Sequence, residues 1–225
     1  AFGATGSDEN DKLTLAITGR ATWSSASPGD VIHLGAWHSY RDMGGNELGD
    51  RFARGEVRET NVRLVNYAAG GTTVSLDSLS QSGLEFAFQA DSLTLEAEYA
   101  SRALDALNSS DDLDGERFDG FHISASYFLG GEQRQYKASS ALFAQPKNIK
   151  NAWELVARVS QMDATSKNQG SEVTTFTLGT SYYVSSDIKF MGNFIYSDVE
   201  GPGTAALVGD EDSGMGFSAR MQYLF

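Results

Sequence analysis

Hydrophobic and polar residues alternate with a period of two along most of the chain, as they do in β-strands whose two faces meet different environments. The regular runs lie at residues 12–23, 84–90, 93–102, 121–127, 153–160, 175–184, 188–197 and 215–225. Two other runs, at 31–43 and 52–66, are strand-like but alternate less cleanly. The pattern predicts about ten strands, each occupying roughly twenty residues with its connection.

The connections between these runs differ in length. Those at 90–92 and 184–187 are tight, whereas those at 67–81, 107–118, 163–172 and 199–214 are long and rich in Gly, Ser, Asp and Asn. Alternating short and long connections are typical of transmembrane β-barrels, and the spacing is too long for an immunoglobulin-type sandwich. Since no linker divides the chain, we predict an all-β, antiparallel barrel domain over residues 1–225.

Two windows are also compatible with helices. Residues 93–107 contain many good helix formers, and residues 153–162 could form a short amphipathic helix. Both match period two as well as they match a helical period, and their neighbours are clear strands. We therefore predict strands for both windows.

Alternation alone does not say which face of the strands is inside, but three features favour an apolar exterior. Aromatic residues gather near strand ends on the apolar face, as in the girdles of outer-membrane barrels. They are Trp23, Tyr99, Tyr127, Trp153, Tyr182, Tyr196 and Tyr223. Charges in the middle of the strands suit a wet lumen. The last strand places Met221, Tyr223 and Phe225 on the apolar parity, which predicts the signal that the outer-membrane insertion machinery reads.

Composition narrows the class of protein further. The 225 residues include no Cys, which excludes disulfide scaffolds, thiolate zinc sites and Cys nucleophiles. A formal net charge of −13 argues against a nucleic-acid partner, because phosphates would be repelled. No apolar stretch reaches the roughly 18 residues of a membrane-spanning helix.

The polar parity supplies candidate pore-lining residues of both signs. The bases are Arg20, Arg102, Arg158, Lys189 and Arg220, and the acids are Glu85, Glu96, Glu98 and Glu154. So balanced a wall does not by itself predict phosphate capture, which needs converging Arg or Lys donors. The excess acid lies in connections, at 8–11, 111–116 and 200–212. These clusters either stay hydrated, which we favour because none has calcium-loop spacing, or bind divalent cations that bridge lipopolysaccharide.

Nothing in the sequence favours an enzyme, a metal site or a cofactor. His33 and His38, five residues apart on one strand, should lie on opposite faces and so cannot share a metal. His122 and Ser124 share a face, but no catalytic Gly-x-Ser-x-Gly or His-Glu-x-x-His motif occurs. The stretch 201–206 matches a relaxed dinucleotide-binding pattern, but we expect no helix after it.

An ordered set of short motifs resembles the phosphate-selective porins of the O and P type. The motifs lie at 15–23, 33–36, 84–99, 126–129, 131–136, 152–158 and 220–222. The resemblance is to the C-terminal portion of such porins, which are sixteen-stranded barrels that assemble as trimers in the Gram-negative outer membrane. It implies passive diffusion of small hydrophilic solutes or ions, with anions such as phosphate among them, through a water-filled lumen. It also implies lipid, lipopolysaccharide and the barrel-assembly machinery as partners.

Ten strands are too few for such a porin, so we expect this chain to be the C-terminal part of a longer one. A compact closed barrel with a structural, adhesive or partner-binding role is the alternative, followed by a soluble all-β binding domain. One inconsistency remains in the predicted topology. If the chain ends in the periplasm, residues 43–51 and 131–150 also lie on that side, where turns should be short. Either an extra hairpin lies around 133–143, or one strand has been miscounted.

Overall fold

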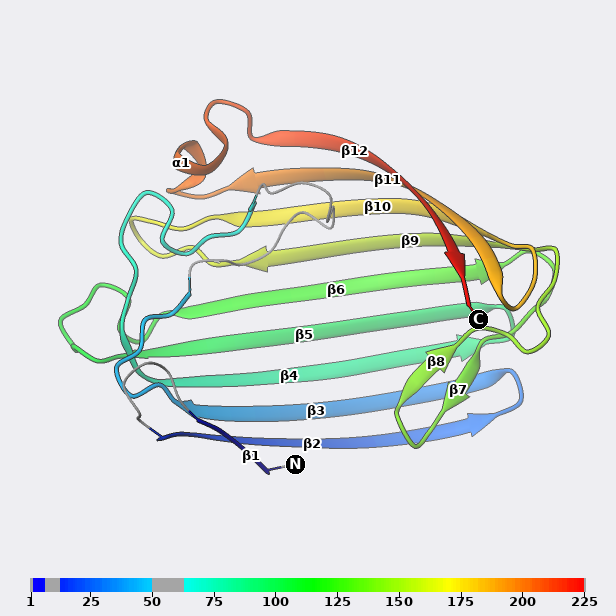
Figure 1. The fold of residues 1–225 in the computed structure, drawn as a ribbon, viewed down its shortest axis with the longest axis horizontal. Helices are drawn as coiled ribbons and strands as arrows, with labels where there is room; N and C mark the ends of the chain where they lie inside the picture. The colour runs from blue at the N-terminus through cyan, green and yellow to red at the C-terminus, as the bar shows by residue number, and fades with distance from the viewer. Residues whose placement is uncertain (1, 7–12, 50–62, 225) are drawn as a thin grey trace.

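Ten strands form one antiparallel sheet in the computed structural model, which describes residues 2–6, 13–49 and 63–224 (Figure 1). Its strands, in spatial order, are β1 (Phe2–Gly6), β2 (Leu13–Ser27), β3 (Asp30–Asp42), β4 (Leu76–Ala90), β5 (Leu93–Ala106), β6 (Arg117–Phe128), β9 (Ala152–Asp163), β10 (Glu172–Tyr183), β11 (Ile188–Glu200) and β12 (Ser213–Tyr223). Strands β7 (Gln135–Lys137) and β8 (Leu142–Ala144) pair only with each other. The all-β, antiparallel prediction is confirmed.

Both windows that were compatible with helices are strands. β5 pairs along its length with β4 and β6, and β9 pairs with β6 and β10. Helix formers such as Leu, Ala and Glu therefore do not decide the outcome here, because two neighbouring strands satisfy the backbone of each window.

The predicted strand at 52–66 is wrong for the part that can be described. Residues 63–66 are not a strand, and residues 50–62 lie outside the described residues. The alternation also did not predict β1, so the count of ten strands is reached with one strand misplaced. β3 ends at Asp42, and the described residues 43–49 and 63–75, which lie between β3 and β4 in the chain, form no strand of the sheet. The predicted periplasmic turn at 43–51 falls in this interval, and its last two residues lie outside the described residues.

The two ends of the sheet differ (Figure 1). At one end, which we call the turn end, lie the connections 28–29, 91–92, 129–151 and 184–187. At the other, the loop end, lie the described residues 43–49 and 63–75 and the connections 107–116, 164–171 and 201–212. Short turns mark the periplasmic side of an outer-membrane barrel. The extra hairpin expected around 133–143 is present as β7–β8, so the long connection at the turn end is itself folded.

The faces of the sheet are inverted relative to a water-soluble protein. Outward side chains are large and apolar, such as Leu84 (60% exposed) and Leu178 (64%). Inward side chains are polar even where they are buried, as at His33, Gln89 and Glu154. The soluble all-β alternative is therefore wrong, because it would place the apolar parity inside. Lipid is the environment that this outer surface matches.

Aromatic residues form a row on the outer face near the turn end. Trp23, Tyr127, Trp153 and Tyr223 are each about half exposed or more. The Trp153 and Tyr182 rings pack with centroids 4.7 Å apart. Aromatic side chains at this height suit the boundary between lipid and water, which supports the girdle prediction.

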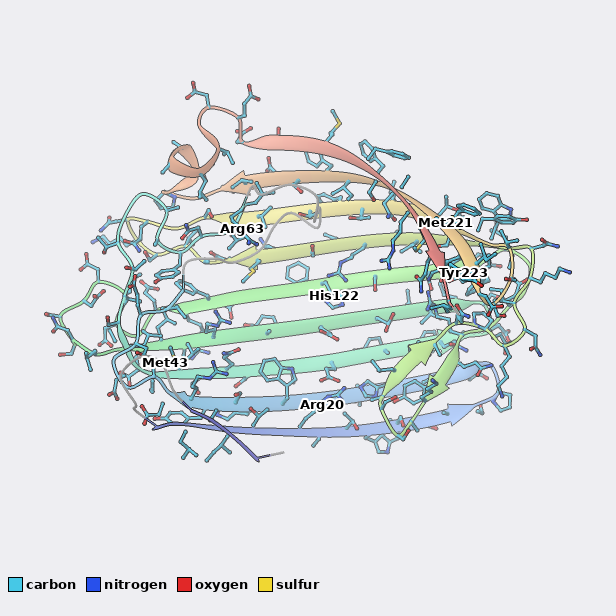
Figure 2. The ribbon with its side chains drawn as sticks, in the orientation of Figure 1. Arg20, Met43, Arg63, His122, Met221 and Tyr223 are labelled. Atoms are coloured by element: carbon cyan, nitrogen blue, oxygen red, sulfur yellow. The ribbon has the colours of Figure 1, made fainter. Side chains whose placement is uncertain are left out.

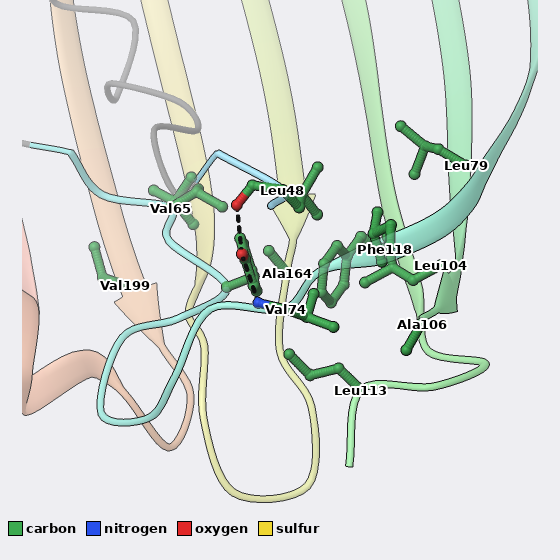
Figure 3. Packing of buried hydrophobic residues seen from close by; sticks show 13 residues of the cluster. Leu48, Val65, Val74, Leu79, Leu104, Ala106, Leu113, Phe118, Ala164 and Val199 are labelled. Atoms are coloured by element: carbon green, nitrogen blue, oxygen red, sulfur yellow. Dashed lines mark hydrogen bonds between the residues drawn. The ribbon is translucent and has the colours of Figure 1, made fainter. Parts of the chain in front are cut away.

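Hydrophobic residues gather at the loop end, on the inner face (Figure 3). Tyr67 is fully buried there; its hydroxyl donates to the Leu48 carbonyl at 2.5 Å and accepts from the Val74 amide at 3.2 Å. The strands contribute inward side chains such as Leu104 and Phe118. Residues 43–49 and 63–75 are thus packed onto the inner face rather than extending away from the sheet.

A short helix, α1 (Thr204–Val208), begins within the glycine-rich stretch at 201–206, which corrects our expectation of no helix there. The glycines serve loop packing. The Gly203 amide donates to Gly170 O at 2.8 Å, and the Gly170 amide donates to Ala69 O at 2.9 Å. A side chain on Gly203 would collide with the Ala69 backbone. No helix in the described part of the chain is long and apolar enough to cross a membrane.

Candidate functional site: the inner face of the sheet

All nine predicted pore-lining residues lie on the inner parity of their strands. The strand register places them in adjacent rows: Glu85 lies across from Glu98, and Glu98 lies across from His122. Ser124 on β6 lies between Glu96 on β5 and Arg158 on β9, directly across from each. The remaining members follow the same alternation; Arg20 on β2 is labelled in Figure 2. The placement is consistent with a lumen wall; a role in conduction stays a prediction.

The structure adds basic residues that we had not included. Arg41 pairs in register with the inward Leu79, and Arg134 reaches the inner face from the connection between β6 and β9. The alternation of side chains along β3, which points His33 inward, would also have identified Arg41. The inner parity of the described strands therefore carries six basic residues against four acidic ones, and Arg134 adds a base from the connection 129–151. The bases are Arg20, Arg41, Arg102, Arg134, Arg158, Lys189 and Arg220, and the acids are Glu85, Glu96, Glu98 and Glu154.

The connection 129–151 folds back over the inner face at the turn end (Figure 1). The Tyr136 hydroxyl lies 2.7 Å from His33 Nδ1. Gln89 Nε2 donates to the Arg134 carbonyl at 3.1 Å, and Gln133 Nε2 donates to Asp91 Oδ1 at 3.0 Å. These partners come from β3, β4 and the turn after β4, so the hairpin is held across several strands. It covers part of the inner face at the turn end.

Glu154 is the most buried charged group on this face, at 1% exposed. One of its carboxylate oxygens accepts from Arg134, and the other accepts from the Tyr183 hydroxyl at 2.8 Å. Arg134 Nε also donates to Ser126 Oγ at 3.2 Å, and Lys189 Nζ lies 5.4 Å from the centre of the Tyr183 ring. Glu154 on β9 thus anchors the inward-folded connection to the sheet by its ion pair with Arg134. The Tyr183 hydroxyl, from the neighbouring strand β10, holds the same carboxylate in place.

A second polar chain joins β2 to the hairpin. Arg20 contacts Glu85 through two nitrogens, with Nε to Oε1 at 2.7 Å and Nη2 to Oε2 at 2.5 Å. His33 Nε2 lies 3.3 Å from the same carboxylate. The His33 ring, 3% exposed, therefore bridges Glu85 and Tyr136. Opposite charges are thus paired between strands on this face.

The histidines are placed as the spacing indicated. His33 points inward, while His38 lies on the outer face with its Nδ1 2.9 Å from Ser82 Oγ. His122 and Ser124 both lie on the inner parity of β6. Within residues 2–6, 13–49 and 63–224, no three His, Asp or Glu side chains are grouped so that they could hold a metal ion.

The predicted insertion signal is seen in part. Met221 and Tyr223 project from the outer face of β12, both more than half exposed (Figure 2). Phe225 lies outside the described residues. Recognition of this strand by an insertion machinery stays a prediction.

Among solved structures, this chain is similar to two forms of OmpT, an outer membrane protein of Vibrio cholerae. The loop L8 deletion mutant shares 12% sequence identity, with a TM-score of 0.48 over 97% of this chain and 56% of that one. The trimer form folded in vitro shares 13% identity, with a TM-score of 0.46 over 93% of this chain and 57% of that one.

Two sequence comparisons bear on the family. Porin O of Pseudomonas aeruginosa is 27% identical over 232 residues, which cover 88% of this chain and 50% of that protein. The chain thus spans about half the length of this curated relative. The family model for phosphate-selective porin O and P matches residues 1–225. Together with a sheet that is apolar outside and charged inside, this match shows that the chain belongs to the phosphate-selective porin O and P family of the bacterial outer membrane.

Proposed function

We propose that this chain forms part of the wall of a water-filled channel through which small hydrophilic solutes diffuse passively, with a preference for anions. The observation that carries the proposal is the inner face itself: six bases and four acids on the strands line the concave side of a sheet whose outer side is apolar, and Arg134 reaches the same side from the connection 129–151. A wall of this kind acts by partition and electric field, so it requires no catalytic group.

The anion preference rests on the excess of bases along the wall. Arg41 and Arg134 raise the basic count beyond the near balance expected from sequence, and Glu154 is already paired with Arg134. Phosphate is one anion that such a wall could admit, and the family name supports it. Many of the chain's carboxylates lie in connections at the loop end, away from the middle of the wall.

Single-channel recording in planar bilayers tests this function. We expect the purified protein to conduct current. Under a KCl gradient, the reversal potential should lie between zero and the equilibrium potential of chloride. This reversal potential should move closer to zero as the salt concentration is raised from about 0.1 M to 1 M, because the Debye length falls from about 10 Å to about 3 Å. The double variant Arg158→Glu and Lys189→Glu should move the reversal potential toward potassium, whereas Lys167→Glu in the exposed loop 164–171 should not. A cation-selective wild-type channel would contradict the preference.

We further propose that these strands are part of a larger closed barrel. In the described sheet β1 pairs only with β2, and β12 pairs only with β11. Unpaired strand edges carry backbone groups that lipid cannot satisfy, so the sheet must be completed by further strands. Sixteen strands in total and assembly as a trimer are the family's arrangement and are proposed here on that resemblance.

The mass of the intact polypeptide from its native membrane tests the larger barrel. We expect about twice the 24.2 kDa of this sequence, since the chain covers 50% of Porin O. A mass of 24.2 kDa would overturn the proposal and favour the compact barrel with a structural or adhesive role. The native mass of the detergent-purified particle tests the trimer in the same preparation.

A further inference from the structure

The last residues of the connection 129–151 lie at the turn end of the sheet (Figure 1). They meet the aromatic row of the outer face there: the Tyr182 hydroxyl donates to Asn151 Oδ1 at 3.2 Å, and the Tyr182 ring packs against Trp153. The ring of such a tyrosine lies in lipid, and its hydroxyl lies among the headgroups. Asn151 therefore lies at the height of the lipid headgroups on the periplasmic side.

Two exposed lysines lie on either side of a buried residue in this segment. Lys147 and Lys150 are exposed, whereas Ile149 is 3% exposed and packs in a small apolar cluster on the inner side. Asn148 and Asn151 have positive φ angles of 53° and 52°, a left-handed conformation that asparagine adopts more readily than most residues. The backbone and the buried side chain thus fix the segment while both lysines stay exposed.

The lysines are not engaged by other described residues. Within residues 2–6, 13–49 and 63–224, no hydrogen bond or ion pair involves either ammonium group. Gln145 Nε2 donates to the Ser186 carbonyl at 2.7 Å, which places the segment against the turn 184–187. Asp187 of that turn is an acidic residue on the same rim, and its carboxylate accepts from Ser186 Oγ at 3.0 Å. The segment and the turn together carry two positive charges and one negative charge, so this part of the rim is net basic.

The two ends of the sheet differ in charge. The connection 129–151 carries four basic residues and one acidic residue. The loop-end connections 107–116 and 201–212 carry four and three acidic residues, and neither carries a basic one. Basic side chains near a membrane surface attract anionic lipid, and acidic side chains repel it. An anionic phospholipid is therefore favoured at the turn end and disfavoured at the loop end.

We propose that Lys147 and Lys150 bind the headgroup phosphate of an anionic phospholipid, such as phosphatidylglycerol, in the periplasmic leaflet. Lys150, next to Asn151 at the tip of Tyr182, contacts the phosphate. The Cα of Lys147 lies within about 11 Å of that of Lys150, close to the Debye length of about 10 Å at 0.1 M salt, so Lys147 adds attraction without contact. The acyl chains lie along Trp153. This site is on the outer rim rather than in the lumen, so the inference goes beyond the proposed channel.

Lipid retention by the purified protein tests the proposal. The protein is equilibrated at low salt in mixed micelles with equal amounts of phosphatidylglycerol and phosphatidylethanolamine that have the same acyl chains. Lipids that stay bound through gel filtration are then quantified by mass spectrometry. We expect phosphatidylglycerol to exceed phosphatidylethanolamine about tenfold, since one lysine at an anionic surface raises affinity roughly fivefold and a more distant lysine adds less. Lys150→Gln should therefore lower the ratio about fivefold, and Lys147→Gln about twofold.

The double variant Lys147→Gln and Lys150→Gln should retain the two lipids about equally. Lys137→Gln combined with Lys167→Gln, a matched loss of two exposed lysines on the inner hairpin and at the loop end, should leave the ratio unchanged. Equal retention by the wild-type protein would overturn the proposal. A preference that persists in the double variant would also overturn it, because the lipid would then bind elsewhere on the protein.

Inorganic phosphate separates a lipid site from a site for the free ion. It meets the same lysines but has no acyl chain to bury against the aromatic row, so it binds more weakly. Millimolar phosphate at constant ionic strength should therefore leave the bound phosphatidylglycerol in place. Displacement of the lipid under these conditions would show a phosphate site and overturn the choice of a phospholipid.

Discussion

Replacing Ile123 by arginine is expected to destabilise the folded protein by about 2–4 kcal/mol, because the side chain lies on the outer face in the middle of β6. Ile123 is 50% exposed on a surface that is otherwise apolar and suited to lipid. An arginine there would have to leave water for hydrocarbon or distort the bilayer to reach the headgroups. Urea titration of the protein folded into lipid vesicles measures the loss.

The neighbouring residue provides the matched control. Ser124 lies one position along β6, on the inner face, and directly across from Glu96. Ser124→Arg should change stability by less than about 1 kcal/mol, since the new charge lies in water with Glu96 across from it on one side and Arg158 on the other. Because the two variants introduce the same residue at adjacent positions of one strand, the difference between their stabilities reports which face of the sheet the arginine is on. The strand propensity of arginine affects both variants equally. If Ser124→Arg were the costly change and Ile123→Arg were tolerated, the inverted orientation of the sheet would be wrong.

Replacing Glu154 by leucine is the second change for which we expect a large effect, about 3 kcal/mol of lost stability. The carboxylate is buried and receives hydrogen bonds from Arg134 and from the Tyr183 hydroxyl. Leucine leaves the guanidinium and the hydroxyl without this partner, and the cost of such orphaned buried groups dominates. Unfolding in denaturant, followed by tryptophan fluorescence, measures the change.

Two further variants separate the loss of the Glu154–Arg134 ion pair from the effect of removing any carboxylate on the inner face. Glu154→Leu combined with Arg134→Leu should recover part of the loss, because no charge is then left unpaired. Glu96→Gln, at an exposed inner-face carboxylate, should stay within about 0.5 kcal/mol of the wild type. Since Glu154 anchors the connection 129–151, Glu154→Leu should also speed trypsin cleavage after Lys137. Unchanged cleavage together with unchanged stability would show that the anchor is not needed.

Local alternation was enough to predict most of the sheet and the faces of its strands. Each strand presents successive side chains to opposite sides, so the parity of Ile123 and Ser124 could be read without knowing any partner. The same reasoning predicted nine of the charges on the inner face, though not Arg41 or Arg134, and the opposite placement of His33 and His38. It failed at residues 63–66 and at β1, where the alternation is weak or the run is short.

The sequence by itself determined a transmembrane sheet with an apolar exterior and a charged interior, because those properties depend on neighbours two residues apart. Only the tertiary structure decided how that interior is filled. The contact of His33 with Tyr136 joins residues 103 positions apart, and that of Glu154 with Tyr183 joins residues 29 apart. No local pattern encodes that the connection 129–151 turns inward, or that Phe118 and Arg158 border one cavity. Such contacts depend on the register of several strands at once, and that register is set when the whole sheet assembles.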